Sequence, residues 1–502
     1  MAAHEKHGSR PLRFHRGFRV VTALTLSTGL ASCGGGGGSA GAVAGLGATT
    51  GAITGFGSIF VNGVEVHLST STRVNDGLGG EDDLRLGQVV EVEARFSSDG
   101  RSAQATSVRF DALVEGPVSA LGASGFDVLG QTVLVDAQTV FERVSLETLA
   151  VGNVVEVHGL RDADGAIRAT RVEFQAPAFI PGAGRFLEVE GEIRALVGTT
   201  FRLGALLVDG SLARFDDLPV GGLRDGLVVE VKSDRALEER GGEAVLVATT
   251  IEGRERLFGG APGGMLAGER LEVEGFVTTA PQPDGDGASS FAIGATIVRV
   301  TATTVFENGT LGDLVRNVKV EAEGHIDENG VLVAVKVSLR RASSVRIEAL
   351  VDRVAGGVVT LLGLDVTAGA QTIVEDKSRA QRASFSIADV RAGDFLVVRG
   401  FQAAGARIVA NRLEREDPDE RSLLRGPASV DAAERLLVLG VEVLLSGATR
   451  FEDRGGQPIG RAAFLDAVEN GNFAVTAKGA EMVDGRILAE EVELEDQVPE
   501  QE

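Results

Sequence analysis

Cysteine and histidine, which serve enzymes as nucleophile, general base and metal ligands, are scarce in this sequence. The chain has one cysteine, Cys33, and six histidines, three of which follow that cysteine: His67, His158 and His325. A Ser or Cys triad needs a histidine beside its nucleophile, and a zinc site needs several Cys or His ligands close together. Each of the three histidines stands alone in a strand-like or strand-end segment. The sequence therefore predicts no catalytic residue of these kinds, no metal site and no cofactor.

Carboxylates are the one abundant chemical resource, with 72 Asp and Glu against 49 Lys and Arg. Two carboxylates are enough for a glycosidase. However, the recurring acids Glu91, Glu156, Glu230 and Glu321 fall on alternating positions of expected strands, which is the pattern of solvated strand faces. An active site in a repeat protein needs at least one copy in which candidate catalytic residues depart from the repeated pattern, and no copy carries such a departure. The prediction is that the chain is not an enzyme, with a carboxylate-based hydrolase as the alternative.

Three glycine-containing segments resemble binding loops only in part. The segments 162–165 and 284–287 each begin like a calcium loop but lack the spaced oxygen ligands and the bidentate Glu that follow in a full loop. Asp162-Ala163-Asp164-Gly165 also aligns with other Gly turns, so we expect a hairpin turn there. The segment 45–51 imitates a dinucleotide loop, but it follows a Gly-rich stretch and precedes a strand instead of a helix. We therefore expect it to be a linker.

The N-terminal residues predict export. Five bases precede residue 20 against the single acid Glu5, and the apolar run 20–30 then leads to Leu30-Ala31-Ser32-Cys33. A basic flank, a short apolar core and small residues before a cleavage point are typical of a secretory signal peptide. The apolar run is too short to span a bilayer, which takes about 20 residues. Residues 1–32 are thus expected to be removed.

The four residues ending at Cys33 resemble the lipobox of bacterial lipoproteins. That resemblance implies that the thiol of Cys33 is lipidated and that Cys33 becomes the acylated N-terminus, anchored in the membrane by several acyl chains. Gly34 stands where the family uses Asp for inner-membrane retention, so the resemblance favours the outer membrane and leaves the face open. An ordinary signal peptide with an incidental cysteine is the alternative.

The segment after Cys33 is expected to be a flexible tether. Residues 33–50 include a run of glycines, which gives a chain with little preferred conformation. Cleavage before Cys33 removes five of the 49 basic and one of the 72 acidic residues, which changes the formal charge from −23 to −27.

The rest of the chain repeats one pattern six times. Its clearest element is an apolar strand ending in Gly, followed by a short strand of the form Thr-x-apolar-Glu. Four of these second strands are Thr139-Val140-Phe141-Glu142, Thr304-Val305-Phe306-Glu307, Thr372-Ile373-Val374-Glu375 and Thr449-Arg450-Phe451-Glu452. The first copy has Thr72-Arg73-Val74, and the third is degenerate near Arg214-Phe215. A Val-Glu-Gly opening strand, a Val-Glu-Val strand and an Asp-Gly or Asn-Gly turn complete the unit.

The alternation period of the strands and the positions of the turn residues predict the fold. Short runs of alternating apolar and polar residues indicate half-buried strands, and the Gly turns indicate hairpins. One segment of helical spacing, such as 145–149 or 462–468, follows the Thr-x-apolar-Glu strand. The order β-β-β-α-β-β is that of an OB-type barrel. We therefore expect an all-β, tandem array of about six small OB-like five-stranded barrels, each with one short helix.

This pattern is similar to a bacterial repeat domain of unknown function that is OB-like and occurs in tandem in exported lipoproteins. The resemblance implies fold and export, and it brings no catalytic residues with it. The expected divisions are a signal peptide at 1–32, a tether at 33–50, repeats at 51–111, 112–175, 186–253, 268–341, 345–416 and 422–496, and an acidic tail at 497–502. Repeats three and four depart most from the pattern.

The composition limits the classes of ligand that the chain is expected to bind. The acidic balance argues against nucleic acid, and the chain has neither Trp nor Tyr with which to stack bases or sugars. Phe126, Phe141, Phe291 and Phe306 fall at matched positions expected to be core. We predict a non-catalytic, lipid-anchored envelope protein whose repeats act as a binding or spacer module for an envelope protein or polymer. Weak divalent cation binding, including Ca²⁺, is the other alternative.

Overall fold

Short strands make up most of the regular structure in the computed structural model, which describes residues 45–497 apart from 57, 76, 79, 255–264, 341–342, 383, 404–406, 472 and 483. All of these belong to one of the two units of the chain, Val43–Glu502. The predicted signal peptide, Leu30 to Cys33, residues 33–44 of the tether and residues 498–502 of the tail lie outside the described residues.

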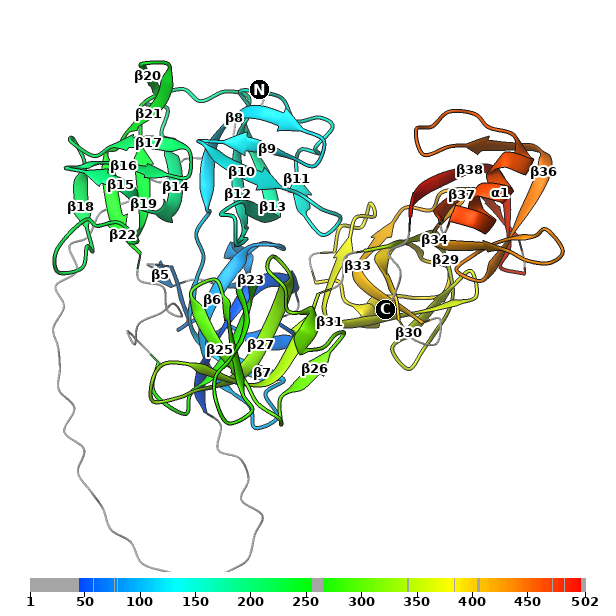
Figure 1. Ribbon diagram of the computed structural model, residues 1–502, viewed down its shortest axis with the longest axis horizontal. Coiled ribbons are helices and arrows are strands. Elements are labelled where there is room, and N and C mark those ends of the chain that lie inside the picture. The colour runs from blue at the N-terminus through cyan, green and yellow to red at the C-terminus, as the bar shows by residue number, and fades with distance from the viewer. Residues whose placement is uncertain are drawn as a thin grey trace, which may run out of the picture. The chain divides into compact units, whose positions relative to one another are not determined.

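The strands form six groups, each of which returns on itself as a small barrel (Figure 1). Barrel 1 contains β1 (Leu46–Gly55), β2 (Ile59–Val61), β3 (Val64–His67), β4 (Arg73–Val74), β5 (Gly77–Leu78), β6 (Val89–Phe96) and β7 (Ser102–Arg109). Barrel 2 contains β8 (Val114–Gly122), β9 (Gly125–Val128), β10 (Gln131–Leu134), β11 (Val140–Glu142), β12 (Val154–Arg161) and β13 (Ile167–Ala176). Barrel 3 contains β14 (Leu187–Glu192), β15 (Arg194–Val197), β16 (Thr200–Leu203), β17 (Leu206–Asp209), β18 (Arg214–Asp216), β19 (Val228–Ser233), β20 (Glu238–Arg240), β21 (Glu243–Val247) and β22 (Thr250–Gly253).

The second half of the chain continues in the same way. Barrel 4 contains β23 (Arg270–Pro283), β24 (Ser289–Ile293), β25 (Thr296–Val300), β26 (Val305–Glu307), β27 (Lys319–Ile326) and β28 (Leu332–Leu339). Barrel 5 contains β29 (Val345–Ala355), β30 (Val358–Leu361), β31 (Leu364–Asp376), β32 (Phe395–Gln402) and β33 (Ile408–Glu416). Barrel 6, orange to red in Figure 1, contains β34 (Ser422–Val430), β35 (Leu436–Val438), β36 (Val441–Glu452), the helix α1 (Arg461–Gly471), β37 (Phe473–Glu481) and β38 (Ile487–Gln497).

The strand order confirms the OB-type prediction. In barrel 5, β29 pairs with β30 and β32, β30 pairs with β31, and β33 pairs with β32 and, in parallel, with β31. The ring order is therefore first, second, third, fifth, fourth, as in an OB barrel. Barrels 1, 2, 4 and 6 repeat these pairings. Barrel 3 differs because its first, fourth and fifth strands are each broken in two, and its strands divide between two sheets.

The prediction of one short helix in every repeat is wrong for most of them. Among the described residues α1 is the one α-helix, and Phe464 and Val468 lie buried on one face of it. Barrels 1, 4 and 5 have single 3-10 turns at the same place: Glu81–Asp83, Leu311–Asp313 and Ile387–Asp389. In barrel 2, the N–H groups of Thr148 and Leu149 both donate to the carbonyl of Ser145, which makes one turn only. A single turn bears the unfavourable free energy of helix nucleation and gains none of the hydrogen bonds that further turns would add.

The expected tether boundary also changes, because β1 begins at Leu46 and takes in residues assigned to the tether. Gly47 is paired with Arg270 of β23, and a Cβ atom at Gly47 would lie 2.4 Å from the Arg270 carbonyl oxygen. The glycines of segment 45–51 therefore permit close strand contact, and the segment is neither a linker nor a dinucleotide loop.

The glycine-ended strand has a packing explanation. Leu129 and Gly130 turn the chain between β9 and β10 with φ of 47° and 67°. A leucine in this left-handed region is unusual, and the side chain of Leu129 is buried. A Cβ atom at Gly116 would lie 2.7 Å from the Cγ of Leu129. The Val-Glu-Gly strand therefore leaves room for the turn leucine, and Gly426 does the same for Leu439.

The barrels are joined in pairs through their first strands. β8 of barrel 2 pairs with β14 of barrel 3, β29 of barrel 5 with β34 of barrel 6, and β1 of barrel 1 with β23 of barrel 4. One continuous apolar core runs through barrels 2 and 3, and another runs through barrels 5 and 6. Because a strand edge with unpaired N–H and C=O groups is a liability, this pairing protects the exposed edge of each first strand.

Candidate functional site

The chemically active residue types are kept apart by the fold. His67 lies in β3 of barrel 1, His158 in β12 of barrel 2 and His325 in β27 of barrel 4. Within the described part of the chain, no three His, Cys, Asp or Glu residues are grouped so that they could hold a metal ion. None of the described helices has the length and apolar character needed to cross a membrane. Cys33, Leu30, Ala31 and Ser32 are outside the described residues.

The acidic loop at 162–165 is a hairpin turn, as predicted. The Asp162 side chain accepts hydrogen bonds from the backbone N–H groups of Asp164 and Ala166, at 3.0 Å each. Its other oxygen lies 2.9 Å from Nε of Arg168. Gly165 has a φ of 86°, which suits glycine. The acid therefore stabilises its own turn.

The threonine of the Thr-x-apolar-Glu motif holds the barrel together. In barrel 2, Thr139 Oγ1 donates to the carbonyl of Ala169 in β13 at 2.8 Å and accepts from the N–H of Asp136 at 3.0 Å. The same donation occurs at Thr72 to Ala105, Thr304 to Ala334, Thr372 to Ala410 and Thr449 to Ala489. This hydroxyl closes the gap where the third strand is interrupted beside the fifth. The motif is therefore a structural clamp.

Loss of this clamp is expected to destabilise the barrel. Replacing Thr139 with valine leaves the Ala169 carbonyl and the Asp136 N–H without their partner, which should cost about 1–3 kcal/mol of unfolding free energy. Calorimetric unfolding measures it, with Thr132→Val on the exposed face of β10 as the matched control. Equal midpoints for the two variants would contradict the clamp.

The prediction that the repeated acids lie on solvated faces is wrong for two of them. Glu230 and Glu321 are 2% and 3% exposed, respectively. The alternation of strand positions was predicted correctly, but Lys232 and Arg254 lie against Glu230, and residues of barrel 5 line the cavity beside Glu321. Along the seam between barrels 2 and 3, Glu115 lies opposite Glu188 on one side and opposite Glu156 on the other. Burial, together with the charges of Glu156 and Glu188, raises the pKa of Glu115 to about 7.

Cations from other strands offset several of these buried acids. Glu274 of β23 lies 3.0 Å from Nζ of Lys319 and 2.9 Å from Nη2 of Arg340, and it accepts a hydrogen bond from the N–H of Ala52 in barrel 1. Burial alone would raise the pKa of Glu274, but Lys319 and Arg340 outweigh it and lower that pKa to about 2. The same side chain thus links barrels 1 and 4.

Two arginines at matched repeat positions extend this network between barrels. Arg171 and Arg412 each follow the clamp alanine by two residues, and each is 2% exposed. Nη1 of Arg171 donates to the Leu86 carbonyl in barrel 1 at 3.1 Å. Nη1 of Arg412 donates to the carbonyls of Gln138 and Thr139 in barrel 2, both at 3.1 Å. Neither arginine was predicted as a site residue from the sequence, although the Ala-x-Arg spacing that the two copies share was a signal for both.

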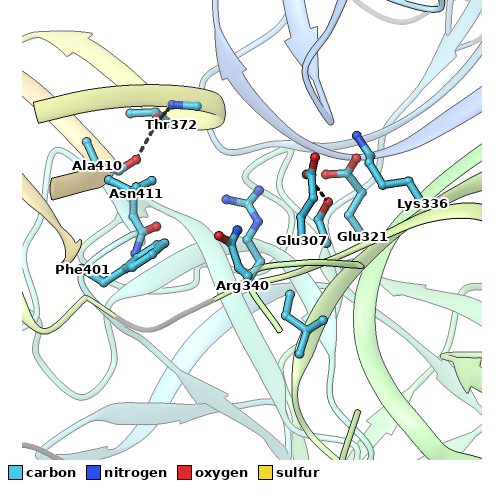
Figure 2. A pocket seen from close by; sticks show the side chains of 13 residues that line it. Glu307, Glu321, Lys336, Arg340, Thr372, Phe401, Ala410 and Asn411 are labelled. Carbon is cyan, nitrogen blue, oxygen red and sulfur yellow. Dashed lines mark hydrogen bonds between the residues drawn. The ribbon is translucent and has the colours of Figure 1, made fainter. Parts of the chain in front are cut away.

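One cavity of about 130 Å³ lies where β26 to β28 of barrel 4 face β31 to β33 of barrel 5 (Figure 2). It mixes charged with apolar side chains. Its lining consists of Glu307, Asn308, Glu321, Lys336, Ser338, Leu339, Arg340, Gly369, Thr372, Phe401, Val409, Ala410 and Asn411. Pockets for drug-sized ligands usually start near 300 Å³. This cavity has room for a small chemical group.

Comparison with known proteins identifies a family. A solved structure described as drosophila Unr CSD456 aligns with 46% of this chain and 98% of its own length, at 13% identity and a TM-score of 0.11. No curated protein matches the chain. A family described as Domain of unknown function (DUF5666) matches residues 48–109, 115–173, 274–338, 347–414 and 428–493.

These five ranges cover barrels 1, 2, 4, 5 and 6, and together they span more than half of the chain. Barrel 3 lies outside them, and it is also the barrel with broken strands and with Ala213 in place of the clamp threonine. The chain is therefore a tandem-repeat member of the DUF5666 family.

Proposed function

We propose that this chain is an exported, lipid-anchored and non-catalytic protein of the cell envelope, whose paired barrels act as a binding or spacer module. The observation that carries the modular part is the pairing of barrels through their first strands, with cores that continue across two of the seams. Such pairs resist bending at the joint, so the repeats provide reach. Several weak sites on linked barrels would gain avidity.

The anchor rests on the sequence before the barrels. Leu30-Ala31-Ser32-Cys33 follows a basic and apolar leader, and residues 34–45 separate the cysteine from β1. Several acyl chains, at about 0.8 kcal/mol per buried CH₂, hold a protein stably on a bilayer where one chain does not. Gly34 favours the outer membrane over the inner.

Replacing Cys33 with serine is expected to release the protein from membranes. In bacteria fed an alkyne-tagged fatty acid, the wild-type chain should carry the tag and sediment with membranes, while Cys33→Ser should lose both properties. Gly34→Asp is the matched control, since it should keep the tag and move the chain to the inner-membrane fraction. A tagged Cys33→Ser chain would contradict the assignment.

A carboxylate hydrolase acting on envelope polymer is the competing function. Glu307 and Glu321 both line the cavity between barrels 4 and 5, but a volume of about 130 Å³ is small for a polymer segment. Incubation of the mature chain with purified cell-wall polymer should release no soluble fragments, and a pull-down from envelope extract with the same chain should recover a partner. Fragments lost on Glu321→Gln would favour the hydrolase instead.

A further inference from the structure

Glu321 is the acidic side chain of the cavity whose carboxyl group has no hydrogen-bond or ion-pair partner among the described residues. It lies in β27, it is 3% exposed, and its carboxylate lines the cavity. From the described residues, no hydrogen bond and no ion pair within 4 Å reaches this carboxylate. A buried acid normally has a partner, because burial without one costs several kcal/mol.

The other charged groups of the cavity are already engaged. Glu307 accepts a hydrogen bond from Oγ of Ser338 at 2.9 Å. Nζ of Lys336 lies 3.3 Å from Glu323, and Nη2 of Arg340 donates to Glu274 at 2.9 Å. Among these groups the cavity therefore offers one carboxyl group without a contact partner, that of Glu321.

The surroundings of Glu321 keep its proton bound near neutral pH. Burial raises its pKa to about 8, against the attraction of Arg340 and Lys336, while the charges of Glu272 and Glu274 on β23 raise it further. Lys336 on β28 and Glu307 on β26 face the same space (Figure 2). A ligand cation beside the carboxylate would favour its ionised form.

We propose that this cavity binds a compact primary ammonium group, with Glu321 as its counter-ion. The volume of about 130 Å³ exceeds the roughly 30 Å³ that one water takes in the liquid, so it admits an ammonium with a short carbon stem. The opposite wall is lined by the side chains of Phe401 and of Asn411, whose Nδ2 donates to Oγ of Ser343 at 3.0 Å. The proposal is independent of the lipid anchor.

Calorimetric titration of the purified full chain with ethanolammonium chloride tests this site. At a pH about one unit above the pKa of Glu321, the wild-type chain should bind, and Glu321→Gln should weaken association at least about tenfold. Glu91→Gln is the matched control, because Glu91 occupies the same repeat position in barrel 1 and does not line the cavity. Sodium chloride at equal ionic strength supplies the blank.

A second variant changes the wall of the cavity opposite Glu321. Gly369 lines it from β31, and a Cβ atom there would meet no heavy atom within 4 Å. Gly369→Val should therefore fold, narrow the cavity and weaken ethanolammonium binding while Glu321 stays in place. This variant decides the question if Glu321→Gln fails to fold.

Two further titrations identify the source and the class of ligand. Flotation of the Cys33→Ser chain with phosphatidylethanolamine vesicles, compared with phosphatidylcholine vesicles, separates a lipid headgroup from a free amine, and either one supports the proposal. Potassium chloride that binds as tightly as ethanolammonium would overturn it in favour of an inorganic cation. Absence of ethanolammonium binding to the wild-type chain would also overturn it.

Discussion

Replacing Arg412 with methionine is expected to lower the unfolding free energy of barrels 5 and 6 by about 3 kcal/mol or more, the usual cost of breaking a buried ion pair from one side. Arg412 lies 2.8 Å from Glu414 and 2.9 Å from Glu375. Its loss also removes the donor that reaches the Gln138 and Thr139 carbonyls of barrel 2. Methionine keeps the apolar volume of the side chain but cannot donate.

The measurement is denaturant unfolding followed by circular dichroism, because a chain without Trp or Tyr lacks the usual fluorescence probes. Arg450→Met is the matched control: Arg450 also pairs with a glutamate, Glu491, but is 65% exposed, so it should cost less than about 1 kcal/mol. Adding Glu414→Gln to Arg412→Met should cost less than the sum of the two single changes. Similar losses for Arg412→Met and Arg450→Met would contradict the buried role of Arg412.

Stability is expected to fall as the pH rises from about 5 to 8, with Glu115 as a main cause. Its pKa is raised to about 7, so the stability associated with the protonated acid is fully present below the unfolded value of 4.5 and is lost as the pH rises through 7. Each pKa unit corresponds to about 1.4 kcal/mol, so the difference between 4.5 and about 7 makes the full effect about 3.5 kcal/mol. Burial likewise raises the pKa of Glu272 to about 7.

Glu115→Gln should remove much of this alkaline slope, because the amide stays neutral at every pH. Unfolding free energies across a pH series provide the measurement, and Glu238→Gln in the exposed strand β20 is the control. At acidic pH the unfolding free energy should instead fall as the pH is lowered. The stability due to Glu274, whose pKa is lowered to about 2, is present above pH 4.5 and is lost as the pH falls towards 2. An unchanged alkaline slope in Glu115→Gln would refute the seam assignment.

Local patterns predicted the barrel well because they report local structure. The Asp-Gly and Asn-Gly turns of the repeat supply positive φ, and they correctly marked the hairpins at Gly100, Gly165, Gly330 and Gly485. Phe126 and Phe291, expected in the core, are 3% and 2% exposed, while Phe141 and Phe306 are half-buried against it. The helix prediction failed in most repeats because a helical spacing of apolar residues does not reveal whether the connection is long enough for more than one turn.

The acids show why the site was less predictable. Period two identifies which residues share a face of a strand, and it placed Glu230 and Glu321 correctly on the outer faces of their barrels. It does not reveal what covers that face. Both acids are buried, Glu230 against Lys232 and Arg254, and Glu321 in the cavity that residues of barrel 5 also line.

By itself the sequence determined a repeated, OB-type, all-β chain with an expected export signal. Turns, strand period and the order of elements depend on residues that lie close together in the sequence, so local patterns reveal them. Tertiary structure alone decided the pairing of barrel 1 with barrel 4, the buried ion pairs of Arg171 and Arg412, and the cavity at Glu321. The physical reason is distance along the chain. Strand edges and charges find partners by shape and complementarity across hundreds of residues, and no local pattern records which surfaces will meet.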